Sequence, residues 1–538
     1  MANNNIFCFC TELEKFYFSP IAIIPYSGIN SNFQNLYVFI GLGDDANTVT
    51  TSSITPTIFS AKNLYKDIIA LKKANINDIS AIAERIDWTA NNHYFAYSDT
   101  EYLSERDSNG KLIKKFYVRN KYDQVFKCLW NNVNTANSFN ITGIVNNSNT
   151  YYTITHSGGT LNPGQYVTIL NSDPDEYNGT YLIINSGLGV ANVAYGNSSY
   201  MLKTTSAYTA NGKIKYAQLT TEEPMYDTGT FDENAIIETS DGYKWKYIYT
   251  IDSAAKLKFF DSEWMPVPVA LEYPNPDNSV YGYGSIDIIN VVDGGDGYPE
   301  GSGTAQITID GDGTGFEAET FVANGTSSIS SISVINHGKN YSYANVSVVD
   351  PIGFTGNAVS IQYTISPIGG HGTNPMRELY TQNIMVSVSF EGTEANNIPS
   401  DIIFNQVGLI YNPYEVSNTN YYAESGILTR INTITVSPSV NQYNQGEFVY
   451  QTENGYRGRV LSVDNINNTI YVINKDRTPL ENYPIIGEES STNRIVMAVA
   501  NSSYTQFSGN IFYIENKLLS ERSENSIEQV RISIRYSR

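Results

Sequence analysis

The string with the most unusual local chemistry is Gly369-Gly370-His371-Gly372. An imidazole on a tight turn can act as a general base, which takes a proton from a reacting group. No nucleophile is evident beside His371 in the sequence. Glycine suits backbone conformations that other residues avoid, and Pro367 stands just before the string. We therefore interpret these four residues as a structural turn at the exit of a domain.

An aspartate-rich string, 310–315, begins like a calcium-binding loop, with oxygen-bearing side chains at its first, third and fifth positions. Such a loop needs a bidentate Glu at its twelfth position, and Phe321 stands there. Asp-Gly pairs are also favoured wherever a turn needs a positive φ. The string therefore predicts a turn, and we predict no metal.

The chain has three cysteines, Cys8, Cys10 and Cys128, and four histidines that lack ligand spacing to one another. Cys8 and Cys10 would lie on one face of a strand and could supply two metal ligands. A structural zinc site needs four ligands, so buried free thiols are the better interpretation. We predict no cofactor.

Catalytic signatures are not evident elsewhere. Carboxylates are abundant, but nothing in the sequence selects a pair for glycoside hydrolysis. No phosphate-binding loop and no Gly-x-Ser-x-Gly elbow is present. We expect a protein that is not an enzyme.

Charge and hydropathy exclude further classes. The 54 acidic and 33 basic residues give a net charge of −21, and no Lys/Arg cluster stands out. A nucleic-acid binder needs such clusters to neutralise phosphates, so we expect no nucleic-acid partner and no docking on an anionic membrane. The first residues do not resemble a secretion signal, and no apolar run reaches about 18 residues, so we expect synthesis in the cytoplasm.

Most of the chain has the pattern of short β-strands. Apolar and polar residues alternate in 244–249 and 385–390, and 40 glycines supply turns. One region differs: apolar residues at 64, 68 and 71, and again at 79, 82 and 86, have helical spacing. Ser60 and Asp78 are suitable N-caps there. We predict a mainly β, multidomain fold. It has a sandwich-like or barrel-like core with inserted small β domains, and a short helical segment near 60–86.

Three stretches have the regular strands and turns of separate β modules. The first, 136–218, predicts a small sandwich or barrel, and the third, 436–503, a small barrel. The second, 286–367, contains a weak twofold repeat, in which 289–298 matches 332–341. These modules would interrupt a core formed by the four remaining parts, which are 1–135 (with the helices), 219–285, 368–435 and 504–538.

Five blocks in this core resemble the dimeric wedge proteins of the T-even phage baseplate and their relatives in other contractile phages. The blocks are 35–41, 122–129 (preceded by 117–120), 241–249 (followed by 264–268), 406–413, and 509–517 with 528–534. Their order also matches the family, and Gly369-Gly370-His371-Gly372 resembles a segment of longer relatives. Where the family commonly has a proline-containing turn in the last block, this chain has Lys517-Leu518-Leu519-Ser520.

The resemblance implies a structural subunit of a phage-tail baseplate, located in the virion and assembled in the host cytoplasm. It implies a homodimer that contacts other wedge proteins and takes part in the rearrangement that triggers sheath contraction. Two alternatives stay open: a carbohydrate-binding tail-fibre or receptor-binding protein, and a glycan-degrading tail enzyme.

Overall fold

The computed structural model describes residues 35–43, 65–99, 103–133, 138–147, 151–194, 206–227, 236–268, 284–367, 370–392, 394, 397–474 and 477–535. The mainly β prediction is confirmed, because strands dominate this part of the chain and the helices are short. The chain divides into two compact units, Met1–Ile82 with Leu257–Phe259 and Gln382–Arg538, and Ala83–Lys256 with Phe260–Thr381. Among the described residues, no helix is both long and apolar enough to cross a membrane.

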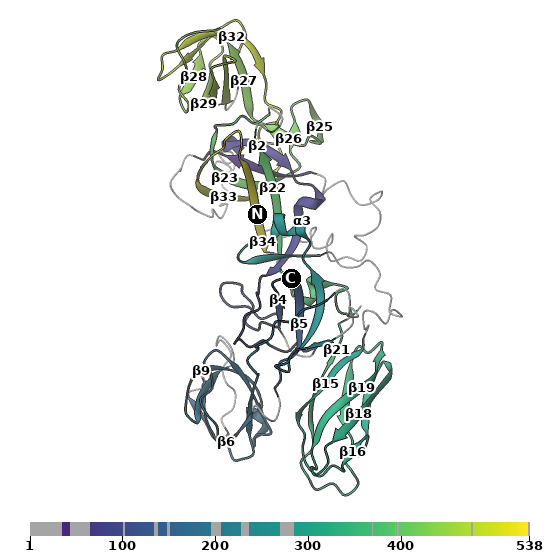
Figure 1. The fold of residues 1–538 in the computed structure, drawn as a ribbon. Coiled ribbons are helices and arrows are strands. Elements are labelled where there is room, and N and C mark those ends of the chain that lie inside the picture. The colour runs from purple at the N-terminus through teal and green to yellow at the C-terminus, as the bar shows by residue number, and fades with distance from the viewer. Residues whose placement is uncertain are drawn as a thin grey trace. The chain divides into compact units, whose positions relative to one another are not determined.

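The first unit contains a five-stranded antiparallel sheet in the order β26-β2-β1-β23-β33 (Figure 1). The strands are β26 (Ile427–Thr429), β2 (Ile68–Lys73), β1 (Leu36–Gly41), β23 (Ile403–Tyr411) and β33 (Asn510–Glu521). Every residue of β1 is buried, which explains its continuous apolar sequence. In a second sheet, β22 (Asn383–Glu391) pairs with β3 (Ile79–Glu84) and with β34 (Ile527–Arg535).

The helical interpretation of 60–86 is wrong over most of its length. Of its described part, only 65–67 is helical, and β2 and β3 follow, separated by a 3-10 turn, Ile76–Asp78. In both strands, residues on the two faces are buried, so apolar side chains fill consecutive positions. A continuous apolar run contains helically spaced residues by default, and periodicity then cannot distinguish strand from helix. Asp78 closes the 3-10 turn, since its Oδ2 accepts from the amide of Asn75.

The second unit contains a four-stranded sheet in the order β12-β13-β5-β4. The strands are β12 (Ile236–Glu238), β13 (Lys244–Thr250), β5 (Gln124–Trp130) and β4 (Tyr117–Arg119). Trp245 is fully buried and stacks on Tyr243, with ring centroids 5.4 Å apart. The chain also forms the short elements α3 (Ser253–Phe259), β14 (Trp264–Val267) and α4 (Pro375–Glu378).

Strands from Ser138 to Tyr216 form a closed antiparallel barrel in the second unit, in the ring order β10-β7-β6-β11-β8-β9. The strands are β6 (Ser138–Asn147), β7 (Tyr151–His156), β8 (Tyr166–Leu170), β9 (Gly179–Gly187), β10 (Val190–Ala194) and β11 (Lys213–Tyr216), with a 3-10 turn at Asp175–Tyr177. Alternate residues point into one apolar core, which includes Val167, Ile169 and Tyr181.

A second closed barrel belongs to the first unit and has the ring order β27-β30-β29-β28-β31-β32. Its strands are β27 (Ile431–Val436), β28 (Phe448–Gln451), β29 (Tyr456–Asp464), β30 (Thr469–Asn474), β31 (Pro484–Gly487) and β32 (Asn493–Ala500). A small hairpin, β24 (Tyr414–Glu415) with β25 (Asn418–Tyr422), precedes β26 in the chain. Figure 1 shows the strands of each barrel curving into a ring.

The repeat in 286–367 is visible in the strand pairing. The first copy supplies β15 (Ile286–Asp293), β16 (Gly301–Ser302), β17 (Ile307–Gly311) and β18 (Thr314–Val322), and the second supplies β19 (Ile329–Lys339), β20 (Ala344–Val348) and β21 (Ser360–Ile365). The first strand of each copy pairs with the last strand of the other, β15 with β21 and β19 with β18, while β17 pairs with β20. The two copies are therefore intertwined.

The turns of the two copies are also equivalent. The side chain of Asp293 accepts from the amide of Gly295, and that of Asn336 accepts from the amide of Gly338. Gly295 and Gly338 have φ of +62° and +65°. Each copy then buries a tyrosine, Tyr298 or Tyr341. The sequence repeat thus reflects a structural duplication. In both copies the turn requires a residue with positive φ, which glycine adopts most easily.

The chain enters and leaves each of these three modules at one point, where a backbone hydrogen bond joins the two ends. The amide of Gln218 donates to the carbonyl of Asn131 at 3.1 Å, beside the first barrel. The equivalent bonds are Ser366 to Ser285 at 2.9 Å for the duplicated module and Ser503 to Thr429 at 3.0 Å for the second barrel. We call these three bonds the necks of the modules.

Candidate functional site

The His371 turn lies in the second unit and leads into α4. Gly370 and Gly372 have φ of +85° and +81°, where a side chain is strained. Gly369 lies outside the described residues. Gly370 donates its amide to the carbonyl of Pro367, and Thr373 Oγ1 donates to the carbonyl of Gly370. These bonds hold the imidazole of His371 in a fixed direction, toward the protein interior.

His371 belongs to a chain of four buried ionisable side chains. Its Nε2 lies 2.7 Å from Asp287 Oδ2, and its Nδ1 lies 3.0 Å from Glu378 Oε2. Lys127 Nζ donates to Glu378 Oε2 at 2.6 Å and lies 3.3 Å from His371 Nδ1. The side chains of Lys127, His371 and Glu378 are each at most 3% exposed. We call Lys127, Glu378, His371 and Asp287 the buried charge cluster.

Electrostatics favour the ionised form of Glu378. Burial alone would raise the pKa of this carboxyl, but Lys127 and His371 outweigh burial and lower the pKa to about 2. The amide of Gly372 also donates to Glu378 Oε1 at 2.6 Å. Lys127 and His371 thus lie within hydrogen-bond distance of the two carboxylates, Glu378 and Asp287. Such pairing is what allows charged groups to remain in a protein interior.

The buried charge cluster joins three separate parts of the second unit. Lys127 belongs to β5, Asp287 to β15 of the duplicated module, and Glu378 to α4. The ring of Tyr97 also lies 4.0 Å from Lys127 Nζ, in a cation–π contact. General-base chemistry requires a substrate within reach of the imidazole, and His371 is only 4% exposed. The arrangement is suited to holding segments together.

Sequence reasoning identified His371 but missed Lys127, Glu378 and Asp287. A signal existed for Lys127, because it stands between apolar residues, in a strand whose seven residues are all buried. A lysine in such a strand requires a buried anion. The sequence could not identify which of the many carboxylates supplies it.

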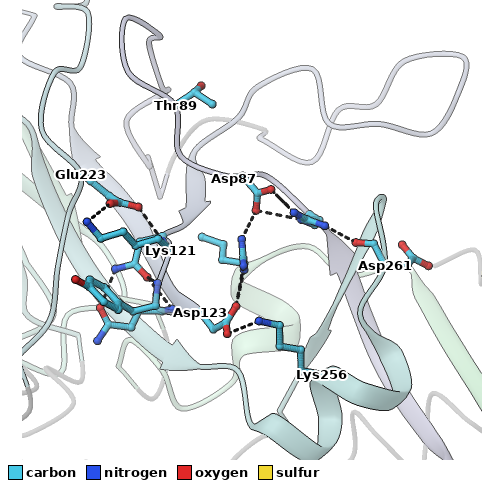
Figure 2. Close-up of polar contacts among 12 residues, drawn as sticks. Asp87, Thr89, Lys121, Asp123, Glu223, Lys256 and Asp261 are labelled. Atoms are coloured by element: carbon cyan, nitrogen blue, oxygen red, sulfur yellow. Dashed lines mark hydrogen bonds and ion pairs between the residues drawn. The ribbon is translucent and has the colours of Figure 1, made fainter.

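A second polar cluster includes Asp87, Asp123 and Lys256 (Figure 2). Asp87 accepts hydrogen bonds from Arg85 and Arg119, and Asp123 accepts from Arg119 and Lys256. The charged groups of Arg85, Arg119 and Lys256 lie 4.5, 4.8 and 5.3 Å from the centre of the Phe260 ring. Lys121 and Glu223 form a neighbouring ion pair.

The carboxylates of this second cluster are stabilised as anions. Burial would raise the pKa of Asp87, but hydrogen bonds from Arg85 and Arg119 lower it, and Lys256 and Arg119 do the same for Asp123. The side chains are partly exposed, so solvent weakens each ion pair. With its anions and cations already paired, the cluster is suited to fixing the loops that carry it.

A cavity of about 360 Å³ lies in the second unit, between the first barrel, residues 93–99 and β21. Its wall contains aromatic side chains and neutral polar groups, including Tyr166, His93 and Gln362. Burial and the nearby Lys115 lower the pKa of His93 to about 4, so its imidazole is neutral at pH 7. The lining includes Asp99 but no lysine or arginine, which suits a neutral polar ligand better than a phosphate.

The remaining candidate metal residues are accounted for as follows. Within the described ranges, no group of three or more His, Cys, Asp and Glu side chains could hold a metal ion. Burial raises the pKa of Cys128, whose thiol donates to the carbonyl of Trp130, and Cys8 and Cys10 lie outside the described residues. Asp312 accepts from the amides of Ser342 and Tyr343, so it holds a turn.

No protein-family model matches the chain, and no curated protein matches it. Its function is therefore argued from the five sequence blocks and from the geometry described above.

Proposed function

We propose that this chain is a structural subunit of a contractile phage-tail baseplate, which acts by binding other proteins. The observation that carries the proposal is the position, in the fold, of the five blocks that resemble the wedge proteins. Blocks 35–41, 406–413 and 509–517 contribute β1, β23 and β33, which are neighbours in one sheet. Val38 pairs with Leu409, and Leu409 pairs with Tyr513.

The other two blocks are also paired with each other. Block 122–129 contributes β5 and block 241–249 contributes β13, and Trp245 lies opposite Cys128. Lys127 of this sheet contacts His371 of the turn that resembles longer relatives. Blocks distant in sequence thus form two contiguous sheets, as expected if the resemblance reflects a shared fold rather than chance similarity of short strings.

A non-catalytic role is supported by the buried charge cluster, which holds His371 away from solvent. The tyrosine-rich composition, 42 residues, suits protein interfaces, and we propose a homodimer that contacts other wedge proteins in the virion. The proposed mechanism is mechanical, through interfaces that rearrange before sheath contraction.

The direct experiment is to tag the chain in the virus that encodes it and to image purified tails by electron microscopy. We expect the tag at the baseplate, and tails without this gene product should lack an assembled plate. Light scattering on the purified chain tests the dimer. A tag found only on fibres, or normal plates without the chain, would overturn the proposal.

The cavity beside Tyr166 favours a second candidate, a carbohydrate-binding receptor protein. A sugar presents apolar C–H faces to aromatic rings and hydroxyl groups to neutral polar side chains, and the cavity wall offers both kinds of partner. Titration with a panel of neutral monosaccharides distinguishes the two, using His93→Ala as the cavity variant. Saturable binding that this variant abolishes would favour the receptor.

A further inference from the structure

The two barrels are circular permutations of one ring. Matching the strands in chain order pairs β27 with β7, β28 with β8, and so on to β31 with β11. Strands that are neighbours in one ring are then neighbours in the other ring as well. The remaining strands, β32 and β6, then occupy the same place, although β6 begins its barrel and β32 ends its own. All six ladders in each barrel are antiparallel.

The turns before the matched strands β8 and β28 agree in detail. Their sequences are Asn162-Pro163-Gly164-Gln165-Tyr166-Val167 and Asn444-Gln445-Gly446-Glu447-Phe448-Val449. The two glycines have φ of +84° and +89°. In each turn, the residue after the glycine donates its amide to the carbonyl of the asparagine, Gln165 to Asn162 and Glu447 to Asn444.

The bonds from these turns to the matched strands β9 and β29 also agree. Gly164 donates its amide to the carbonyl of Ile183, whose amide donates to the carbonyl of Gln165. In the second barrel, Gly446 donates to Val460, which donates to Glu447. A shared ring, turn sequence, glycine conformation and bonding pattern make the matched faces of the two barrels directly comparable.

In the first barrel, the chain itself covers the outer face of β8 and β9. Tyr166 and Thr168 point outward from β8, because they alternate with core residues. The ring of Phe95 lies 4.0 Å from that of Tyr166 at an interplanar angle of 75°, and His93 lies 6.3 Å from the same ring. The covering segment, 93–99, contains aromatic residues and ends in Asp99. The ring of Phe95 thus packs on this face, and Asp99 lines the same cavity as Tyr166.

In the second barrel, the matched face is partly exposed, because Arg457 is exposed and Phe448, Tyr450 and Arg459 are half-buried. Phe448 and Tyr450 point outward from β28 and lie opposite Arg459 and Arg457 of β29. The side chain of Arg457 is 54% exposed, and its guanidinium lies 3.9 Å from the Phe448 ring centre. Among the described residues, no aromatic ring contacts Phe448 or Tyr450 as Phe95 contacts Tyr166. Two aromatic side chains and two arginines therefore share a partly exposed surface on a chain of net charge −21.

We propose that this face, Phe448, Tyr450, Arg457 and Arg459, is a docking surface for an extended segment of another protein that carries an aromatic and an acidic side chain. The aromatic ring packs on Phe448 and Tyr450, as Phe95 packs on Tyr166. The carboxylate binds Arg457, whose Nε and NH2 groups now donate to the two oxygens of Glu488 at 2.7 and 2.9 Å. A partner's carboxylate can replace Glu488 in that bidentate geometry. The proposal needs no assignment to a baseplate.

The test uses the full chain and a fluorescent peptide with the sequence of residues 91–99, Asn-Asn-His-Tyr-Phe-Ala-Tyr-Ser-Asp. We expect a saturable rise in anisotropy. Arg457→Glu should weaken binding about tenfold or more, which corresponds to one lost charged hydrogen bond. Phe448→Ala should also weaken binding, and a peptide with Asp99→Lys should not bind.

Two controls separate the face from the rest of the protein. Ile466→Ala alters an exposed apolar residue elsewhere in the same barrel, and Lys517→Glu reverses an exposed charge outside it; both should bind as wild type. Thermal unfolding checks that each variant is folded. If Phe448→Ala does not fold, Tyr450→Ser takes its place. No saturable binding to the wild type, or equal binding to Arg457→Glu and the wild type, would overturn the proposal.

Discussion

Lys127 Nζ lies 2.6 Å from Glu378 Oε2 across 251 residues of sequence, and both side chains are buried. The chain between Lys127 and Glu378 includes the first barrel and the duplicated module. The ion pair therefore forms only if both modules fold so that Lys127 and Glu378 come together. This ion pair therefore reports on the folding of the whole second unit.

Removal of one partner should destabilise that unit. We expect Lys127→Met to lower the free energy of unfolding by about 3–5 kcal/mol, because the buried Glu378 loses the ammonium group that neutralises its charge. All four tryptophans belong to the second unit, so denaturant unfolding followed by tryptophan fluorescence measures it selectively. The control is Lys121→Met in the same unit, which breaks an ion pair between the exposed Lys121 and Glu223 and should change stability by less than about 1 kcal/mol. Equal effects would contradict the assignment.

Acid should weaken the same unit. The pKa of Glu378 is about 2 in the folded protein and 4.5 in the reference state, so its stabilising effect is complete above pH 4.5 and is lost as pH falls toward 2. The expected loss is about 3 kcal/mol over this range. In Glu378→Gln, the dependence of tryptophan-detected stability on pH between 5 and 3 should be smaller. An unchanged slope would show that other groups dominate.

Gly372 should not tolerate a side chain. Its φ is +81°, and a Cβ there would lie 3.1 Å from the carbonyl oxygen of Ile248. We expect Gly372→Ala to cost about 1–3 kcal/mol. Gly159→Ala is the matched control in the same unit, because no heavy atom lies within 4 Å of its Cβ position and its φ is ordinary. Similar melting temperatures for the two variants would contradict the strained turn.

Neither copy of the duplicated module should fold alone. Residues 284–327 contain β15 and β18 but lack their partners β21 and β19, whereas 284–367 contains every ladder. We expect dispersed amide signals from the longer fragment and none from the shorter one at low concentration. A folded monomer of 284–327 would show that the exchanged ladders are dispensable.

Sequence patterns predicted strands where buried residues alternate with more exposed ones, as in β7. They failed for β2, where four consecutive residues are buried and periodicity loses its meaning. The His371 turn was noticed because its glycines are local, but its partners Asp287 and Lys127 are set by three-dimensional packing. The sequence predicts a small sandwich or barrel for 136–218 and a small barrel for 436–503, but not their permutation. Ring order depends on which strands pair, and chain order does not reveal it.

The three necks have a consequence for how such a chain can evolve. Each module starts and ends on residues that already share a hydrogen bond, such as Thr429 and Ser503, so its removal leaves a gap that a tight turn can span. Recombination at a neck would exchange a whole module in one event, without shifting the register of the sheet from which it projects. The sheets can then remain constant in a lineage while its modules are gained, lost or replaced, and each exchange alters what the protein presents to its surroundings.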